Sequence, residues 1–243
     1  MSELVPELPE RRAFLTARWE NLCLVTYAVD PARLKPFLHS ELSLDTVDGR
    51  AFVSLVAFDF LDTRVLGIPW PGYRCFPEVN LRFYVRHGDQ RGVVFIREYV
   101  PKRLIAWIAR SLYNEPYLAV PMRSSWQNLG TDATVEHELD TAGTTHRLRM
   151  RLGENSGIPH SQSAAHFFKE HSWGFGQSRA GALLRYQVWH PLWETRTVES
   201  LDLDWDFGAV YGPEWADLSH AEPHHVAFAL GSEIRVYPKK SLG

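Results

Sequence analysis

Apolar and polar positions alternate along residues 76–86. Successive side chains of a β-strand point to opposite faces, so Val79, Leu81, Phe83 and Val85 would share one face. The opposite face would carry the polar side chains Glu78, Asn80, Arg82, Tyr84 and Arg86. Such a polar row is either the solvated side of an antiparallel sheet or the lining of a cavity. The function of the protein depends on which of the two it is.

Strand patterns recur along most of the chain, each bounded by turn residues. The expected strands cover residues 14–29, 93–98, 117–126, 183–190, 195–203, 226–230 and 233–237, with hairpins over 42–60 and 133–152. Gly231 and Ser232 are expected to form a tight turn between the last two strands. Many short strands with two or three short helices predict an α+β, mainly β fold, either an antiparallel β-barrel or a β-sandwich.

The expected helices have recognisable first turns. Asp30 is a suitable N-cap for a helix over residues 31–38, whose first residue is a proline. A second helix is expected over residues 101–113, because apolar residues there are spaced by four along one side. Ser163 can cap a third, short helix.

Turn chemistry also predicts two hairpin registers. Asp48 and Gly49 suit a type I′ turn, which would pair Leu44 with Val53 on an apolar face. Residues 141–144 suit a four-residue turn in the second hairpin.

The second hairpin carries a row of arginines that resembles a phosphate-binding stripe. Its turn would place Glu138 opposite Arg147 and Glu136 opposite Arg149. We therefore interpret these arginines as members of a cross-strand ion-pair ladder, in which each exposed pair contributes only a few tenths of a kcal/mol.

The chain of 243 residues contains no Gly/Ser-rich or low-complexity stretch that would divide it. We predict a loose N-terminal leader over residues 1–12, a single domain over 13–238 and a short tail over 239–243. Hydrophobic residues make up 45% of the sequence, which is ample for a sizeable core.

Charge and cysteine content exclude several classes of protein. A net charge of −3 without a basic run argues against nucleic acid as a partner. No apolar stretch reaches membrane-spanning length, so no membrane partner is expected. Two cysteines without motif spacing indicate a reducing, cytoplasmic location. A homo-oligomer is left open.

Several short segments together resemble a known family. They are FLTARW (residues 14–19), DGRAFVSL (48–55), EVNLRFYVR (78–86), AR (109–110), EPY (115–117), HPLW (190–193) and EIRVY (233–237). In this order they resemble the YqjF-like family of uncharacterised proteins, within the acetoacetate decarboxylase-like superfamily. The resemblance implies a curved, largely antiparallel barrel around a small-molecule cavity.

Acetoacetate decarboxylases use a lysine that forms a Schiff base with a keto acid, beside a second lysine that lowers its pKa. The resemblance aligns Arg110 with an arginine of their active-site segment and Pro116 with a proline before the two lysines. Tyr117 and Leu118 then occupy the lysine positions. A tyrosine cannot form an imine, so inheritance of this mechanism is not expected.

A second alignment of the same segment is open. Residues 97–103 also resemble it, with Lys102 as the amine and Arg103 as the neighbouring cation. The alternative is that Lys102 is a hydrated lysine in the first turn of an exposed helix. Residues 237–240 also match the proline and the two lysines of the decarboxylase segment, but they lie at a terminus that we expect to fray.

If the polar face of residues 76–86 lines a cavity, its side chains suit acid/base chemistry. Arg82 would hold a carboxylate or polarise a carbonyl, and a partly desolvated Glu78 would exchange a proton. The residues expected to be catalytic are Glu78, Tyr117 and His190. The residues expected to bind substrate are Arg82, Asn80, Tyr84, Arg110 and Trp193.

Three functions follow from these features. The first is a protein that binds a small acidic or carbonyl compound and acts on it by acid/base chemistry. The second is a Schiff-base lyase that uses Lys102, and the third is a non-catalytic ligand sensor or interaction module. No cofactor is expected, and His166 with Glu170 on one helix face does not make a zinc motif, so no metal is expected either.

Overall fold

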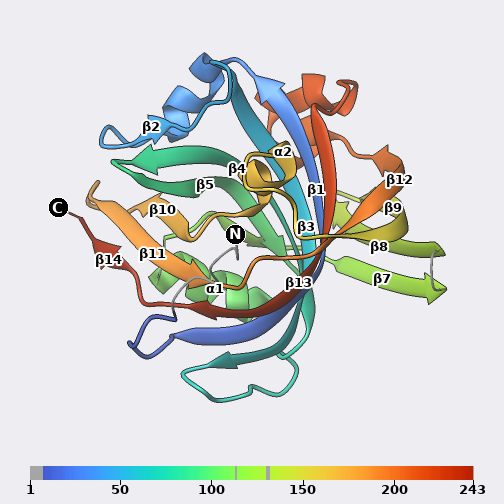
Figure 1. Cartoon of the computed structure of the whole chain (residues 1–243). Coiled ribbons are helices and arrows are strands. Elements are labelled where there is room, and N and C mark those ends of the chain that lie inside the picture. Colours follow the sequence, from blue (N-terminus) through green and yellow to red (C-terminus); the bar gives the residue numbers. More distant parts are fainter. Residues whose placement is uncertain (1–7, 113, 130–131, 243) are drawn as a thin grey trace.

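The computed structural model describes residues 8–112, 114–129 and 132–242. Its central feature is a ring of strands (Figure 1). In ring order these are β1 (Leu15–Val29), β3 (Ala51–Val65), β4 (Phe76–His87), β5 (Gln90–Val100), β10 (Trp173–Gln177), β11 (Leu183–Trp189) and β13 (His225–Val236). The ring closes because β13 pairs with both β11 and β1. The fold is therefore mainly β and barrel-like, as the sequence predicts.

The sheet continues beyond the ring from β13. This extension contains β12 (Thr195–Asp204), β9 (Thr144–Gly157), β8 (Asp132–Thr141) and β7 (Met122–Leu129). Three short strands pair at other edges: β2 (Ser43–Leu44) with β4, β6 (Tyr117–Ala119) with β5, and β14 (Lys240–Ser241) with β11. Strand β14 lies within the segment expected to be a tail. Most pairings are antiparallel, but β5 pairs with β6 and with β10 in parallel.

The helices are short. They are η1 (Pro31–Phe37), α1 (Arg103–Leu112), α2 (Ala164–Lys169), α3 (Phe207–Tyr211) and η2 (Pro213–Ser219). Asp30 and Ser163 are N-caps, as predicted, since their side chains accept backbone N–H bonds. Residue 113, the expected end of the second helix, lies outside the described residues.

Both faces of β4 are covered. Val79, Leu81, Phe83 and Val85 are fully buried in the main hydrophobic core. This core lies outside the ring and includes residues of β8, β9, α3 and η2. A second apolar cluster, which includes Phe58 of β3, lies on the inner side of the ring. The face of β4 that carries Glu78 is therefore turned inward.

The predicted pairing of Leu44 with Val53 is wrong. Asp48 and Gly49 do have positive φ angles, as a type I′ turn requires, but only Val47 and Arg50 bridge across it. Both edges of β3 at Val53 are already occupied, by β1 and by β4. Leu44 consequently pairs with Val85 of β4.

The predicted turn at Gly231 is also wrong, because β13 runs through it without interruption. Gly231 has φ +86°, and a Cβ there would lie 1.9 Å from the backbone oxygen of Trp19. This glycine permits a close approach of β13 to the irregular part of β1 between Glu20 and Cys23. Gly231 followed by Ser232 is thus compatible both with a tight turn and with a continuous strand that approaches its neighbour closely.

The register of the predicted ion-pair ladder is confirmed, but only the pair of Glu136 with Arg149 forms as predicted, because Glu138 pairs with Arg123 of β7. Glu138 lies opposite Arg147 and Glu136 opposite Arg149 in the β8–β9 register. Arg149 pairs with Glu136 at 3.9 Å, while Arg147 approaches Asp202 of β12 at 3.7 Å. Both arginines thus face carboxylates.

No helix among the described residues is long and apolar enough to cross a membrane.

Candidate functional site

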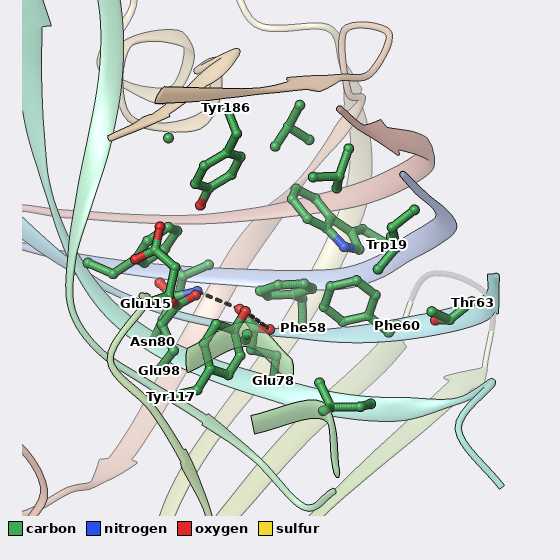
Figure 2. A pocket seen from close by; sticks show the side chains of 18 of the residues that line it. Trp19, Phe58, Phe60, Thr63, Glu78, Asn80, Glu98, Glu115, Tyr117 and Tyr186 are labelled. Atoms are coloured by element: carbon green, nitrogen blue, oxygen red, sulfur yellow. Dashed lines mark hydrogen bonds between the residues drawn. The ribbon is translucent and has the colours of Figure 1, made fainter. Parts of the chain in front are cut away.

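A cavity of about 220 Å³ lies inside the ring. Its wall is mostly apolar, and its polar groups come mainly from β4, β5, β6 and β11, from the residue Glu115 before β6, and from the end of α2 with the segment after it. Figure 2 shows Glu78, Asn80, Glu98, Glu115 and Tyr117 gathered at one end, with Tyr186 facing them.

Strand β4 supplies the first part of this polar end. Glu78, Asn80 and Arg82 all line the cavity, as period-two positions on one strand must. Glu78 and Asn80 are only 3% and 2% exposed. The polar row predicted from the sequence is therefore a cavity lining and not a solvated face.

Two further carboxyl groups join Glu78. Glu98 lies opposite Asn80 in the β4–β5 register, and Glu115 immediately precedes Pro116 and β6. Both side chains are buried and line the cavity. Neither was expected to be a site residue.

Burial determines the protonation of the three carboxyl groups, because loss of hydration disfavours the charged form. It raises the pKa of Glu78 to about 7 and that of Glu115 to about 8. The pKa of Glu98 is raised well above its usual value by burial and by the charges of Glu78 and Glu115. Arg82 acts in the opposite direction on Glu78 and Glu98. Glu78 therefore changes protonation state near neutral pH.

Two side chains fix the carboxyl group of Glu78. The Tyr117 hydroxyl donates to Oε2 at 2.9 Å, and the Asn80 amide donates to Oε1 at 3.2 Å. Burial and the nearby Glu78 raise the pKa of Tyr117 well above its usual value, so its hydroxyl keeps the proton that it donates. Tyr117 is thus a hydrogen-bond donor to Glu78.

Glu115 is held from the opposite side of the ring. The Tyr186 hydroxyl on β11 donates a hydrogen bond to its carboxylate. The ring of Tyr186 lies against Gly174 of β10, where a Cβ would come within 2.2 Å of the ring. Any other residue at position 174 would displace this tyrosine.

Some polar atoms at this end lack a hydrogen-bond partner among the described residues. They are Oδ1 of Asn80, Oε1 of Glu98 and Nε of Arg82. All three residues line the cavity, and burial of an unpaired polar atom is costly. A bound polar molecule would satisfy them.

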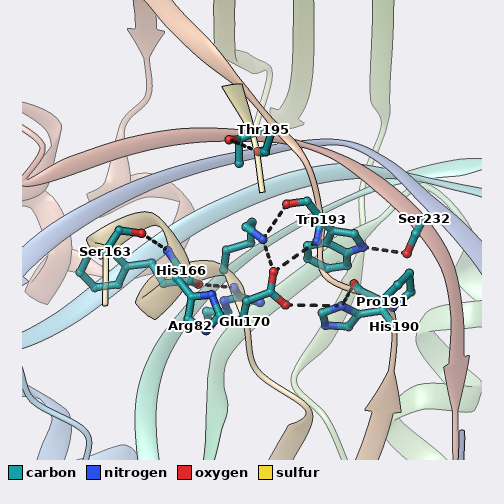
Figure 3. Close-up of polar contacts among 12 residues, drawn as sticks. Arg82, Ser163, His166, Glu170, His190, Pro191, Trp193, Thr195 and Ser232 are labelled. Atoms are coloured by element: carbon teal, nitrogen blue, oxygen red, sulfur yellow. Dashed lines mark hydrogen bonds and ion pairs between the residues drawn. The ribbon is translucent and has the colours of Figure 1, made fainter. Parts of the chain in front are cut away.

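A second polar cluster lies where α2 leads toward β10 (Figure 3). The Lys169 ammonium is fully buried and bonds to the Glu170 carboxylate and to the backbone oxygen of Trp193, the latter at 2.9 Å. The other oxygen of Glu170 lies 3.7 Å from Nδ1 of His190. The His190 ring stacks on Trp193 at 3.9 Å, and burial lowers the pKa of this histidine. Lys169, His190 and Trp193 line the same cavity.

Three residues named from the sequence lie elsewhere. Tyr84 is buried beside Phe168 and bonds to Ser54, outside the cavity lining. Arg110 is exposed on α1 and does not face the cavity. Lys102 precedes α1, with Nζ 5.9 Å from the centroid of the Tyr73 ring, and it is not part of the lining.

Two of the cavity residues that were not predicted from the sequence nevertheless have an unusual sequence context. In the sequence Glu98 stands two residues from Ile96 and from Val100, a spacing at which a carboxyl group is unusual. A register shift at Ile96 places Phe95, and not Ile96, on the cavity face with Glu98. Lys169 directly follows two aromatic residues, Phe167 and Phe168, that are expected to pack against the barrel and to bury this end of the helix. Glu115 belongs to the EPY segment of the family resemblance but had no assigned role, and nothing local marked Tyr186. The two residues meet only through the closure of the ring.

The described residues contain no group of three or more His, Cys, Asp or Glu side chains arranged to hold a metal ion.

Comparison with known sequences identifies the family. Residues 16–233 match the model of a family described as an uncharacterized conserved protein, DUF2071. The chain belongs to this family. It is also 29% identical over 140 residues to the uncharacterized protein YqjF of Bacillus subtilis, covering 57% of this chain and 58% of YqjF. The aligned region thus spans a little over half of that relative.

Solved structures show the same fold at low sequence identity. An acetoacetate decarboxylase-like enzyme from Sphingomonas wittichii superposes with a TM-score of 0.66 at 16% identity, over 96% of this chain and 94% of that one. Acetoacetate decarboxylase from Legionella pneumophila gives 0.67 at 13% identity, over 98% and 93%. The enduracididine biosynthesis enzyme MppR, complexed with pyruvate, gives 0.66 at 12% identity, over 98% and 93%. The fold of this family is therefore that of the acetoacetate decarboxylase-like proteins.

Proposed function

We propose that the protein binds a small acidic or carbonyl compound inside the barrel and exchanges a proton with it through Glu78. The observation that carries this proposal is the buried carboxyl group of Glu78 at the polar end of an apolar cavity, with a pKa raised to about 7. A general base is most effective when its pKa lies near the working pH. The pyruvate complex of MppR, a protein of the same fold, supports a small carbonyl ligand.

The proposed step is proton abstraction beside a carbonyl group. The ionised Glu78 takes the proton as the C–H bond breaks. The electron pair of that bond forms the C=C bond, and the π pair of the carbonyl group moves onto its oxygen to give an enolate. Arg82, whose Nε has no partner among the described residues, is the proposed cation for that oxygen. The proton returns from Glu78 to carbon in the reverse step, after exchange with solvent.

Tyr117 and Asn80 are positioning residues in this scheme. Each donates to one oxygen of Glu78, so together they fix the orientation of the carboxyl group. Loss of either donor would also raise the pKa of Glu78 further, because both bonds favour the ionised form.

The Schiff-base alternative has less support. Lys102 does not line the cavity, and Lys169, which does, holds its ammonium against Glu170 and a backbone carbonyl. An amine must be unprotonated to attack a carbonyl carbon, and the contacts of Lys169 favour its protonated form.

The test is hydrogen–deuterium exchange in D₂O at the methyl carbon of pyruvate and at the carbons next to the carbonyl group of butan-2-one, followed by NMR. We expect Glu78→Gln to slow exchange by roughly 100-fold or more, since it removes the base and keeps the shape. Glu136→Gln, a strand glutamate of the extension, is the matched control and should leave the rate unchanged. Tyr117→Phe should shift the pH–rate profile to higher pH, because loss of this donor raises the pKa of Glu78.

Two results would contradict the proposal. Exchange that survives in Glu78→Gln would remove its catalytic role. Ligand binding without exchange in the wild type would instead identify a non-catalytic sensor on the same scaffold.

A further inference from the structure

We infer that the ligand of this cavity is amphipathic: a carbonyl head beside Glu78 and an apolar tail that extends along β3 toward the loop after it. This inference rests on the proposed function and adds the class of compound. It is carried by the separation of the three carboxyl groups from the aromatic and aliphatic side chains that line the rest of the same cavity.

The three carboxyl groups are confined to one end, whereas Thr63 at the other end has only a hydroxyl group. Glu78, Glu98 and Glu115 lie together, and Figure 2 shows Phe58, Phe60 and Thr63 following one another away from Glu78. Phe58 and Phe60 occupy alternate positions of β3, so their rings lie on the same inward face. At about 3.3 Å per residue, the strand from Phe58 to Thr63 covers roughly 16 Å. The cavity is therefore longer than a three-carbon ligand needs.

The apolar part has rigid walls. Trp19 packs against Phe58 at 5.0 Å and against Phe60 at 5.7 Å between ring centroids. Phe60 in turn stacks on Phe76 at 4.8 Å. Rings that support one another in this way keep a preformed slot, which reduces the entropic cost of binding.

Helix α1 forms another wall of the slot. Leu104, Ile105 and Ile108 line the cavity, whereas Trp107 of the same helix is 59% exposed and does not. One face of the helix thus touches the tail and the other faces solvent.

The far end of the slot reaches the surface. Trp70, in the loop between β3 and β4, lines the cavity and is 48% exposed. Val65 and Tyr73 lie beside it in the lining. This end supplies the entry route, so the tail follows the head into the barrel and fills the passage behind it.

The volume limits the size of the tail. About 220 Å³ corresponds to roughly seven water-sized groups at about 30 Å³ each. Every CH₂ group that leaves water for an apolar slot strengthens binding about fourfold. Affinity should therefore increase with chain length up to roughly six to eight carbons and then level off, when further carbons pass Trp70.

The experiment measures dissociation constants for methyl ketones of four to nine carbons and for the matching 2-oxo acids. We expect a decrease of about fourfold per added carbon in whichever series binds, up to the plateau. If short compounds bind and exchange but added carbons bring no gain, this inference fails and the proposed function stands. If no compound of either series binds, both fail.

Two variants of α1 locate the tail. Ile108→Asn should weaken octan-2-one roughly tenfold more than it weakens butan-2-one, because it makes the slot wall polar. Trp107→Asn, on the exposed face of the same helix, is the matched control. It should leave the dissociation constants of octan-2-one and butan-2-one unchanged. Leu104→Asn repeats the test at a second wall position, and thermal unfolding of each variant confirms that it folds. Equal weakening of both ketones by Ile108→Asn and Leu104→Asn would overturn the placement of the tail.

Discussion

Glutamates occupy the strand face opposite the main core in two regions of this protein, on the ring strands β4 and β5 and on the extension strand β8. In the extension, Glu136 and Glu138 face arginines and remain partly exposed. In the ring, Glu78 and Glu98 are buried, with Arg82 as the cation that acts on both. The same sequence pattern gives screened ion pairs in one place and perturbed acids in the other. Curvature of the sheet, which encloses one face and exposes the other, makes the difference.

The largest expected effect comes from breaking a buried charge pair of the barrel. Lys169→Met leaves Glu170 without its ammonium partner in a site where both side chains are nearly inaccessible. We expect a loss of about 3 to 5 kcal/mol in the free energy of unfolding.

Denaturant titration measures this loss, and Arg149→Met in the extension is the control. It breaks an exposed pair, so its loss should stay below about 0.5 kcal/mol. The double variant Lys169→Met with Glu170→Gln should recover part of the stability, since no unpaired charge remains. Equal losses at Lys169 and Arg149 would remove the contrast between the two regions.

A second prediction concerns pH. The pKa of Glu115 is raised to about 8, so the folded protein binds a proton there that the unfolded chain releases above about 4.5. This contribution to stability is complete below pH 4.5 and is lost as the pH rises through 8. Glu115→Gln should therefore increase the melting temperature at pH 9 by roughly 4 °C or more, with little change at pH 4.5.

Melting curves over this pH range provide the test. Glu138→Gln, which removes a carboxylate held by Arg123 at the surface, should show no such gain at high pH. A lower melting temperature of Glu115→Gln at pH 9 would mean that the native state requires the ionised carboxylate of Glu115.

The smallest expected effect lies in the ladder itself. A double-mutant cycle on Glu136 and Arg149 should give a coupling energy below about 0.5 kcal/mol. That coupling should decrease further in 0.5 M NaCl, because the pair is open to solvent. A salt-resistant coupling of 1 kcal/mol or more would make the extension electrostatically similar to the barrel.

The site was only partly predictable. Alternation placed Glu78, Asn80 and Arg82 on one face correctly, because strand geometry is local. Tyr117 was named through its neighbours in a family motif, and the β5–β6 pairing brings it to Glu98. Arg110 was named from the same motif, but the turn of α1 points it to solvent.

The sequence alone determined most of the strands, the caps at Asp30 and Ser163, and the β8–β9 register, because each depends on residues close together in the chain. Only the tertiary structure decided which face of β4 is enclosed, and it alone brought Glu115, Tyr186 and Lys169 to the cavity. Those residues come from separate segments whose positions depend on the pairing of β13 with β11 and β1. No local pattern encodes a contact that forms only when the ring closes.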